Sequence, residues 1–530
     1  MSANAGQFPA EVVKFATILL LGVSVGVFST LYSPFVALAG AIVFALLTFS
    51  LYVSSHARPV DLIAGRPVVA IGTEPQHNLL FYLCFLSFFL SITIPKSGKT
   101  VANIPITVAN MLILFTLICW LLTSFLSRKT FVVIPLKNLL LLFILYGAAV
   151  SLIGLVNDNQ RKYVILDFVA FMGFIPIYFL VCYVVRTPAH LRKIVWAIGL
   201  SSFLVCSYGL LQTKFSFDLI ALPGITEQSG KIMYEGVGRW NVVEGGAIKV
   251  YSTFQNGNIF GNHLATFIPF LGGILIGPLS ARKKIVPLGV FLLSCYVLIL
   301  TYSRGALVGT LTGMILLAII SKKIRLKAII VMLLIFAILI GFVQQYSDRP
   351  ELTRYDFRRI AANPDQFSAG RVERAKEVLK GFANLPLTAK IFGIGFGGVL
   401  TSPSGGRFGY VDNLYLTLLF KMGLVGLAML FAVLIRFFRT LLQLRLRVSD
   451  LYLRGLINGG IAGLFASLTH NLADTLWFFP PLSANFWFLA GITMAIAMLG
   501  ARQPQPVEAA TRPRNRPPKA KAIRPRFVSA

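Results

Sequence analysis

Long apolar runs separated by short polar segments recur along the whole chain of 530 residues. A helix of about 20 apolar residues crosses the hydrocarbon core of a membrane, which is about 30 Å thick. Backbone groups in lipid must bond within their own segment, and the runs do not alternate with period two, so the pattern predicts helices and not a β-barrel. We expect about fourteen spans, with the approximate limits 12–30, 33–52, 78–94, 104–126, 138–156, 164–185, 191–212, 256–276, 285–301, 304–320, 327–344, 412–435, 455–473 and 481–500.

The composition also indicates an all-α, multi-pass membrane protein. Hydrophobic residues make up 56% of the chain and charged residues 13%, and the mean hydropathy is +0.77. A soluble domain normally carries about 25% charged residues. The five cysteines lie inside apolar runs without CxxC spacing, so we interpret them as buried apolar residues and expect neither a disulfide framework nor a metal site.

The net charge of +30 would suggest a nucleic-acid partner in a soluble protein. Here the basic residues collect in short loops between apolar runs, such as 282–284 and 436–454, so we expect no nucleic acid. The rule that cytoplasmic loops are rich in Lys and Arg predicts that both termini are cytoplasmic. Two long segments, 213–255 and 345–411, then lie outside.

These patterns predict six parts of the chain. They are N-terminal membrane helices (1–212), an external loop (213–255), four further helices (256–344), a large external loop (345–411), three helices (412–500) and a basic, disordered cytoplasmic tail (501–530). The first apolar run is followed by a second without a small-residue cleavage site, so we expect it to stay as an anchor.

Three arginines are candidates for binding an anion at the outer end of the bundle. Arg304, in "TYSRGAL", lies at the outer end of a predicted span, where an arginine either faces a polar cavity or extends to the interface. Arg371 and Arg374 are one turn apart in a predicted amphipathic helix of the large external loop. Guanidinium groups bind phosphate through paired donors, so the three predict a cationic pocket, with a solvated basic face as the alternative.

Acidic and histidine side chains near the same predicted boundary are candidates for proton transfer. Asp412, followed by Asn413, begins a late span and is either a general base on a sugar hydroxyl or a helix N-cap. Lys421, nine residues further, requires a partner inside the bundle, either in a buried pair or in catalysis. His470 and Asp474 are four residues apart, which predicts one shared helix face, although a lone histidine is more often structural.

Sequence motifs of soluble enzyme classes do not appear in their proper context. The sequence contains no H-E-x-x-H or Walker motif, and G-x-S-x-G occurs only inside an apolar run, at 22–26, without a strand–helix context. The glycine-rich "FGIGFGG" at 392–398 follows no strand of a βαβ unit, so it gives little support to dinucleotide binding.

Four motifs occur in a fixed order: "STFQNGNIFGNHLA" (252–265), "TYSRGALVG" (301–309), "GRVERAKEVL" followed by "FGIGFGG", and "DNLYLTLLFKMGLVGL" (412–427). In this combination, residues 205–440 resemble the superfamily of O-antigen ligases and bacterial polysaccharide polymerases. The resemblance implies a C-type membrane fold and a metal-independent, inverting glycosyltransferase without a cofactor. Such enzymes work at the outer, periplasmic face of the bacterial inner membrane.

The resemblance also implies the substrates and a site. A glycan is taken from undecaprenyl diphosphate and passed to lipid A–core by ligases or to another lipid-linked repeat unit by polymerases. Arg304 and Arg371 match the arginines that grip the diphosphate, and with Asp412 they form the predicted catalytic set. We expect these residues to contact substrate as well: Arg374, Asn256, Asn258, Asn413 and His470. The expected partners are the lipid-linked glycan, an acceptor glycan or glycolipid, membrane lipid and a chain-length regulator.

Two departures from the family pattern affect the functional prediction. The ligases usually carry histidine where Asp412 stands, and glutamate is common at the position of Lys421. The first departure favours polymerisation of exopolysaccharide or O-antigen units, with O-antigen ligation as the alternative. The rival from another class is a flippase or transporter of lipid-linked oligosaccharides, although no internal repeat of the kind found in transporters is evident.

Overall fold

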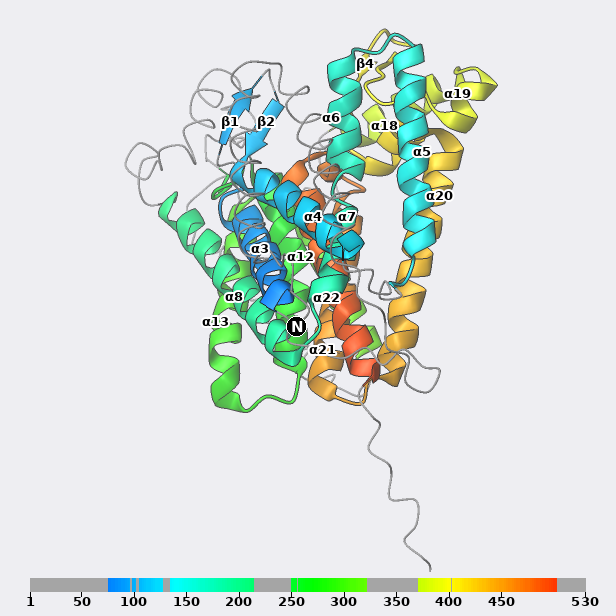
Figure 1. Cartoon of the computed structure of the whole chain (residues 1–530). Helices are drawn as coiled ribbons and strands as arrows, with labels where there is room; N and C mark the ends of the chain where they lie inside the picture. Colours follow the sequence, from blue (N-terminus) through cyan, green and yellow to red (C-terminus); the bar gives the residue numbers. More distant parts are fainter. Residues whose placement is uncertain are drawn as a thin grey trace, which may run out of the picture.

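The computed structural model describes residues 75–95, 98–101, 104–126, 134–213, 249–254, 256–321, 370–401 and 403–502. Helices dominate this part of the chain, and its strands form two short antiparallel hairpins, β1–β2 and β3–β4 (Figure 1). The elements are α3 (Pro75–Thr93), β1 (Gly98–Val101), β2 (Ile104–Thr107), α4 (Val108–Leu126), α5 (Lys137–Val156), α6 (Arg161–Met172), α7 (Pro176–Val184), α8 (Pro188–Leu211), α12 (Gly257–Ile276), α13 (Ala281–Leu300), α14 (Arg304–Ile320), α18 (Arg371–Ala383), α19 (Leu387–Phe392), β3 (Leu400–Thr401), β4 (Arg407–Phe408), α20 (Leu414–Arg447), α21 (Leu451–His470), the 3₁₀ turn η3 (Leu476–Phe478) and α22 (Pro480–Arg502).

The predicted multi-pass, all-α architecture is confirmed in its coarse form. Eight helices in the described residues are long and apolar enough to cross a membrane, and three shorter apolar helices accompany them. Each predicted span in this part of the chain coincides with a helix or a helix pair. The predicted spans 12–30, 33–52 and 327–344 lie outside the described residues, so the total of about fourteen stays a prediction.

Three predicted spans differ from the structure in detail. The span expected at 164–185 is divided, because α6 ends at Met172 and α7 begins at Pro176, a residue that favours the first turn of a helix. The span expected at 104–126 loses its first residues to β2, which pairs with β1. The span expected at 412–435 begins at Leu414 and continues for 34 residues to Arg447, with non-helical backbone at Gly423.

The centre of the bundle consists of α12, α14 and α21, which pack closely on one another. Nearly all of α12 is buried. Small residues allow this approach: a Cβ atom at Gly463 of α21 would lie 2.0 Å from the carbonyl oxygen of Thr266 on α12. Such contacts between small residues are typical of helix packing in membranes.

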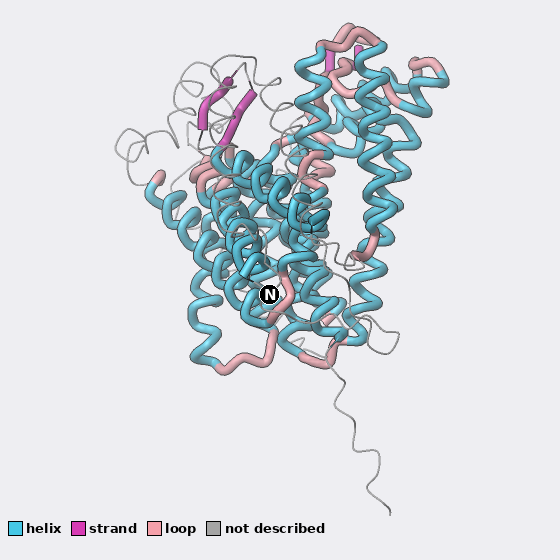
Figure 2. Tube along the Cα trace, viewed as in Figure 1, coloured by secondary structure: helices cyan, strands magenta, loops and turns pink. Residues whose placement is uncertain are grey.

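The elements α18, α19 and the β3–β4 hairpin form a cap at one end of the bundle, beside the ends of α5, α6 and α20 (Figure 1). Helix colouring shows that this cap connects to the bundle through loops at that end (Figure 2). An apolar cluster of Val378, Leu400, Val411 and Phe420 joins α18 and the hairpin to α20. Val372 and Leu379, two apolar residues of α18, are each 46% exposed.

A glycine-rich loop after α19 fills the kink in α20. The backbone of Gly423 is left-handed (φ 68°), which interrupts helical hydrogen bonding. Ile394 N–H donates to the carbonyl of Phe420 (2.9 Å), and Gly395 N–H donates to that of Lys421 (3.1 Å). The hydroxyl of Tyr146 on α5 donates to the carbonyl of Met422 (2.8 Å). Carbonyls at the kink thus receive donors from outside their helix, as membrane-embedded backbone requires.

The close approach of the same loop to α5 predicts a steric requirement at Gly395 that Gly405 does not share. Both glycines have positive φ (88° and 81°), so alanine is strained at either position. A Cβ atom at Gly395 would also lie 2.3 Å from the backbone nitrogen of Gly154, whereas one at Gly405 meets nothing within 4 Å. We expect Gly395→Ala to destabilise the protein by about 1–3 kcal/mol more than Gly405→Ala. Unfolding of the purified variants in detergent measures the difference, and equal destabilisation would contradict the packing described.

Candidate functional site

Two arginines of α18 converge on the carboxylate of Asp412. Gly370 precedes the helix with left-handed backbone, and Arg371 and Arg374 follow in the first turn. Arg374 Nη1 lies 2.8 Å from Asp412 Oδ2, and Arg371 Nε lies 3.5 Å from the same oxygen. The side chains of Arg371, Arg374 and Asp412 are 27%, 44% and 38% exposed, so the cluster is open to solvent. Exposed ion pairs contribute at most about 1 kcal/mol to stability, so folding stability alone does not explain why these charges converge.

Asp474 adds a second carboxylate to this cluster. It lies in the loop between α21 and η3, with Oδ2 4.0 Å from Arg371 Nη2 and 16% of the side chain exposed. Asn258 Nδ2 donates to Oδ2 (3.0 Å), and the backbone N–H of Thr475 donates to Oδ1 (2.9 Å). Burial raises the pKa of Asp474, which the Arg371 guanidinium opposes and the charge of Asp412 reinforces. A carboxyl with a raised pKa holds a proton more readily than an ordinary aspartate.

The three predicted asparagines take different places around the cluster. Asn258 reaches Asp474, as described. Asn256 caps α12, because its side-chain oxygen accepts from the N–H of Ile259 (2.9 Å). Asn413 caps α20 through the N–H of Leu416 (3.0 Å) and donates to the carbonyl of Leu472 (2.9 Å). The substrate contacts predicted for Asn256 and Asn413 remain predictions, and the structure adds a capping role for each.

His470 is buried beneath the cluster, inside the bundle. Its Nδ1 lies 3.2 Å from Asn262 Nδ2, and its Nε2 lies 3.4 Å from Ser303 Oγ. Ser303 Oγ in turn caps α14, which begins at Arg304. The structure therefore places half-buried Arg304 next to residues that pack on His470, at the same end of the bundle as Arg371.

Two local predictions from the sequence are wrong. Asp474 does not share a helix face with His470, because α21 ends at His470 and Asp474 follows in a loop. Asp412 is not the N-cap of α20, because Asn413 takes that position and its side-chain oxygen accepts from the N–H of Leu416. Asp412 and Asp474 therefore both lie in loops, and from these separate loops their carboxylates approach Arg371.

The buried partner that the sequence required for Lys421 is Asp167 of α6. Lys421 Nζ lies 2.5 Å from Asp167 Oδ2, and the two side chains are 2% and 1% exposed. Asp167 also accepts from the N–H of Gly397 (2.7 Å) and from the hydroxyl of Tyr410. Burial and the adjacent charge of Asp167 raise the pKa of Tyr410, which therefore remains a donor. Asp167 was not predicted from the sequence, although an acidic residue inside an apolar run is a signal of a buried polar contact.

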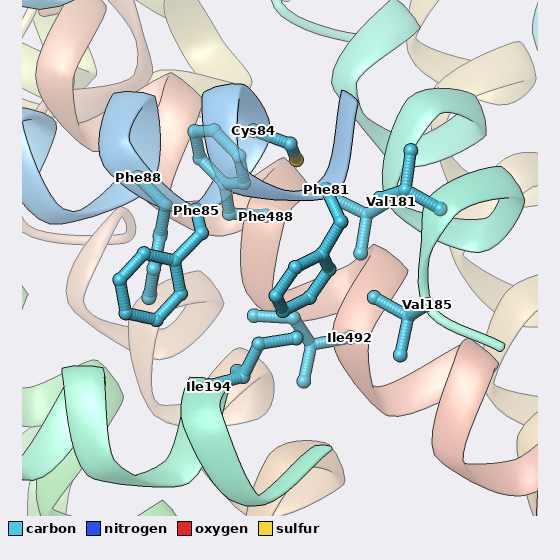
Figure 3. Close-up of a pocket in the computed structure, with 10 residues that line it drawn as sticks. Phe81, Cys84, Phe85, Phe88, Val181, Val185, Ile194, Phe488 and Ile492 are labelled. Atoms are coloured by element: carbon cyan, nitrogen blue, oxygen red, sulfur yellow. The ribbon is translucent and has the colours of Figure 1, made fainter. Parts of the chain in front are cut away.

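A small apolar recess elsewhere in the bundle is not part of this cluster. It lies between α3, α7, α8 and α22 and is lined by aromatic and aliphatic side chains such as Phe81, Phe88, Ile194 and Phe488, with Cys84 at its edge (Figure 3). These side chains carry no charged group that could hold a polar substrate. The recess is therefore a feature of helix packing.

The arrangement of charges can bind a substrate with two anionic groups and handle one proton. Two guanidinium groups face solvent with donors that suit phosphate oxygens. Asp412 and Asp474 neutralise them in the absence of a ligand, and a carboxylate next to a bound hydroxyl can accept its proton. Among the described residues, no group of three or more His, Cys, Asp and Glu side chains is arranged to hold a metal ion.

Comparison with known families matches residues 289–431 to the family model described as O-antigen ligase. The matched segment contains Arg304, Arg371, Arg374 and Asp412, whereas Asn258 and Asp474 lie outside it. The predicted resemblance to the superfamily of O-antigen ligases and polymerases is confirmed over this segment. A search of curated proteins found no match.

The raised pKa of Asp474 predicts how stability depends on pH. The folded state holds this proton more tightly than the unfolded state, so the stabilisation is complete below the ordinary value of 3.8 and is lost as pH rises through the folded pKa. The stability of the wild type relative to Asp474→Asn should therefore fall as pH increases above that value. In an Arg371→Gln background the fall should move to higher pH, because the cation that lowers the pKa is gone. Unfolding in detergent across a pH series measures the two stabilities. A wild type that becomes more stable relative to Asp474→Asn as pH rises would contradict the prediction.

Proposed function

We propose that this protein is a membrane glycosyltransferase that transfers a glycan from undecaprenyl diphosphate to an acceptor sugar. The observation that carries the proposal is the convergence of Arg371 and Arg374 with Asp412 and Asp474 at one end of a bundle of membrane-type helices. The match of residues 289–431 to an O-antigen ligase model supports the same reaction class. A diphosphate on a lipid is the substrate chemistry that such a cationic pair at the end of a bundle suits.

The proposed reaction is a single displacement at the anomeric carbon. The acceptor hydroxyl oxygen forms a bond to this carbon while the bond to the phosphate oxygen breaks and its electron pair leaves with the lipid diphosphate. Arg371 and Arg374 stabilise the negative charge that develops on the diphosphate, and Arg304 supplies a third cation from α14. One displacement inverts the anomeric configuration, and the positive charge comes from side chains, so the reaction needs neither a metal ion nor a cofactor.

The proton of the acceptor hydroxyl passes to a carboxylate. Asp412 is the base predicted from the sequence, but one of its oxygens already faces both arginines. Asp474 is the better base by its chemistry, because burial raises its pKa towards the operating pH. We therefore propose that Asp474 accepts the proton and that Asp412 holds the two guanidinium groups in place. Asn258 orients Asp474 through its hydrogen bond.

The distribution of basic residues supports a periplasmic site. At the opposite end of the bundle, Arg282, Lys283 and Lys284 lie in the first turn of α13, and Arg447 and Arg454 lie on either side of the α20–α21 turn. Under the positive-inside rule this end faces the cytoplasm, so the arginine and carboxylate cluster faces the periplasm of the bacterial inner membrane. The lipid-linked glycan is delivered to that face.

The acceptor distinguishes two versions of the proposal. Polymerisation uses another lipid-linked repeat unit, and Asp412 in place of a histidine favours it. Ligation uses lipid A–core, and the description of the matched family favours it. Incubation of the purified protein with a lipid-linked glycan, with and without lipid A–core, separates the two by product: longer lipid-linked chains for a polymerase, or glycan on lipid A–core for a ligase.

Removal of an arginine should abolish transfer without unfolding the protein. We expect Arg371→Ala to lower kcat/KM by about 100- to 1,000-fold, because a preorganised donor to the developing charge is lost. Arg371→Lys should recover only part of this, since lysine lacks the paired donors. Lys380→Ala, an exposed position of the same helix, is the matched control and should behave like the wild type.

In cells, Arg371→Ala should leave single lipid-linked units at the periplasmic face. Units retained on the cytoplasmic side would favour a flippase. Wild-type polymer from both Arg371→Ala and Arg304→Ala would overturn the proposed binding of the diphosphate by these arginines.

Kinetic measurements should distinguish the roles of the two carboxylates. Asp474→Asn should lower kcat by about 100- to 10,000-fold with lipid diphosphate binding retained, because the base is lost. Asp412→Asn should weaken binding of the lipid diphosphate, because the arginines lose the partner that orients them. Turnover at saturating acceptor and the affinity for the donor are measured for each variant. Full turnover by Asp474→Asn with a loss confined to Asp412→Asn would make Asp412 the base instead.

A further inference from the structure

The buried ion pair between Asp167 and Lys421 has no direct part in the proposed reaction. Asp167 lies on α6 and Lys421 on α20, both almost fully buried, with 2.5 Å between Nζ and Oδ2. Two charges removed from water lose hydration that their attraction does not fully restore, so such a pair is weak support for stability. The best-attested use of buried polar pairs is to fix one arrangement of the elements that carry them.

Asp167 gathers donors from three separate parts of the chain. Oδ2 accepts from Lys421 Nζ and from the N–H of Gly397 (2.7 Å), and Oδ1 accepts from the hydroxyl of Tyr410. Lys421 Nζ also lies 4.6 Å from the centre of the Tyr410 ring, a distance typical of a cation–π contact. A single carboxylate thus ties α20, the glycine-rich loop and the segment after β4 to α6.

The segment that Tyr410 anchors leads directly into the cluster. Val411 follows Tyr410, and its N–H donates to Thr417 Oγ1 (3.1 Å) while its carbonyl accepts from the hydroxyl of Thr475. The N–H of Thr475 donates to Asp474, and Asp412 comes next after Val411. Residues 410–412 are therefore held by Asp167 on one side and by the Asp474 loop on the other.

We infer that Tyr410 and Asp167 are positioning residues that set Asp412 opposite Arg371 and Arg374. The inference rests on the proposed function for its kinetic consequence. The hydroxyl of Tyr410 is the link between the buried ion pair and the segment that carries Asp412. Without this link the segment keeps its contacts at Val411 but loses its anchor on α6, so Asp412 and the two guanidinium groups are no longer held in one geometry. Small misplacement of charged groups around a reacting centre has a large kinetic effect.

The test compares Tyr410→Phe with Tyr146→Phe. Tyr146 is the matched control, because its hydroxyl donates to the carbonyl of Met422, the neighbour of Lys421 on α20, and the bond does not lead to residues 410–412. Tyr410→Phe loses the hydroxyl contact with Asp167 on α6, and Tyr146→Phe loses the hydroxyl contacts with the carbonyls of Met422 and Phe392. Tyr410→Phe leaves in place the contacts of Asp167 with Lys421 and with the Gly397 N–H.

We expect Tyr410→Phe to lower kcat by about 10- to 100-fold, with the KM for the acceptor little changed and a Tm close to that of Tyr146→Phe. Hydrogen exchange at the amides of 411–413 should rise in Tyr410→Phe and stay at the wild-type level in Tyr146→Phe. The exchange measurement needs no turnover, so it tests the anchoring role even if the wild type transfers no glycan. Absence of transfer by the wild type would contradict only the proposed function. Unchanged exchange at 411–413, or equal kcat for the two variants in an active protein, would overturn the inference.

Discussion

Backbone carbonyls at the kink of α20 need donors that their own helix does not supply, and the rest of the site depends on how this requirement is met. Inside an apolar bundle an unpaired carbonyl is costly, so the backbone of the glycine-rich loop donates to the carbonyls of Phe420 and Lys421. The loop can approach α20 because Gly393 has positive φ and lacks a Cβ, which would lie 2.2 Å from the carbonyl oxygen of Lys421. Once seated, it connects the cap that carries Arg371 to the membrane helices. The kink at Gly423 therefore helps to place the cap that carries Arg371 and Arg374.

The cluster beyond this joint combines cations with carboxylates in different surroundings. Asp412 is partly exposed between two arginines, whereas Asp474 is largely buried with a raised pKa. Two groups of one type in unlike environments are able to take different roles, one electrostatic and one in proton transfer. Both are supplied by loops that follow or precede helices, and the rigid bundle of α12, α14 and α21 supports them. The proposed glycosyl transfer uses this division.

Much of the fold and part of the site could be predicted from the sequence. Apolar run length gave the helices, since lipid leaves few alternatives for the backbone, and "RVERAKEVL" gave the amphipathic helix with Arg371 and Arg374. The proximity of Asp412 to these arginines also agrees with their predicted place at one end of the bundle. The partner of Lys421 could not be predicted, because Asp167 is 254 residues away and its pairing depends on how α6 packs. Asp474 was assigned to a helix face, because spacing alone does not reveal that α21 ends at His470. The role of the glycine-rich loop depends on the kink at Gly423, which only the packed structure defines.

The central claim is that the guanidinium groups of Arg371 and Arg374 bind the diphosphate of a lipid-linked glycan. A structure of the purified protein in a lipid nanodisc with an undecaprenyl diphosphate-linked glycan bound measures this most directly. The account predicts diphosphate oxygens within hydrogen-bonding distance of both guanidinium groups, with the anomeric position facing Asp474. A diphosphate bound at the opposite end of the bundle, or held at the same end without either arginine, would contradict it.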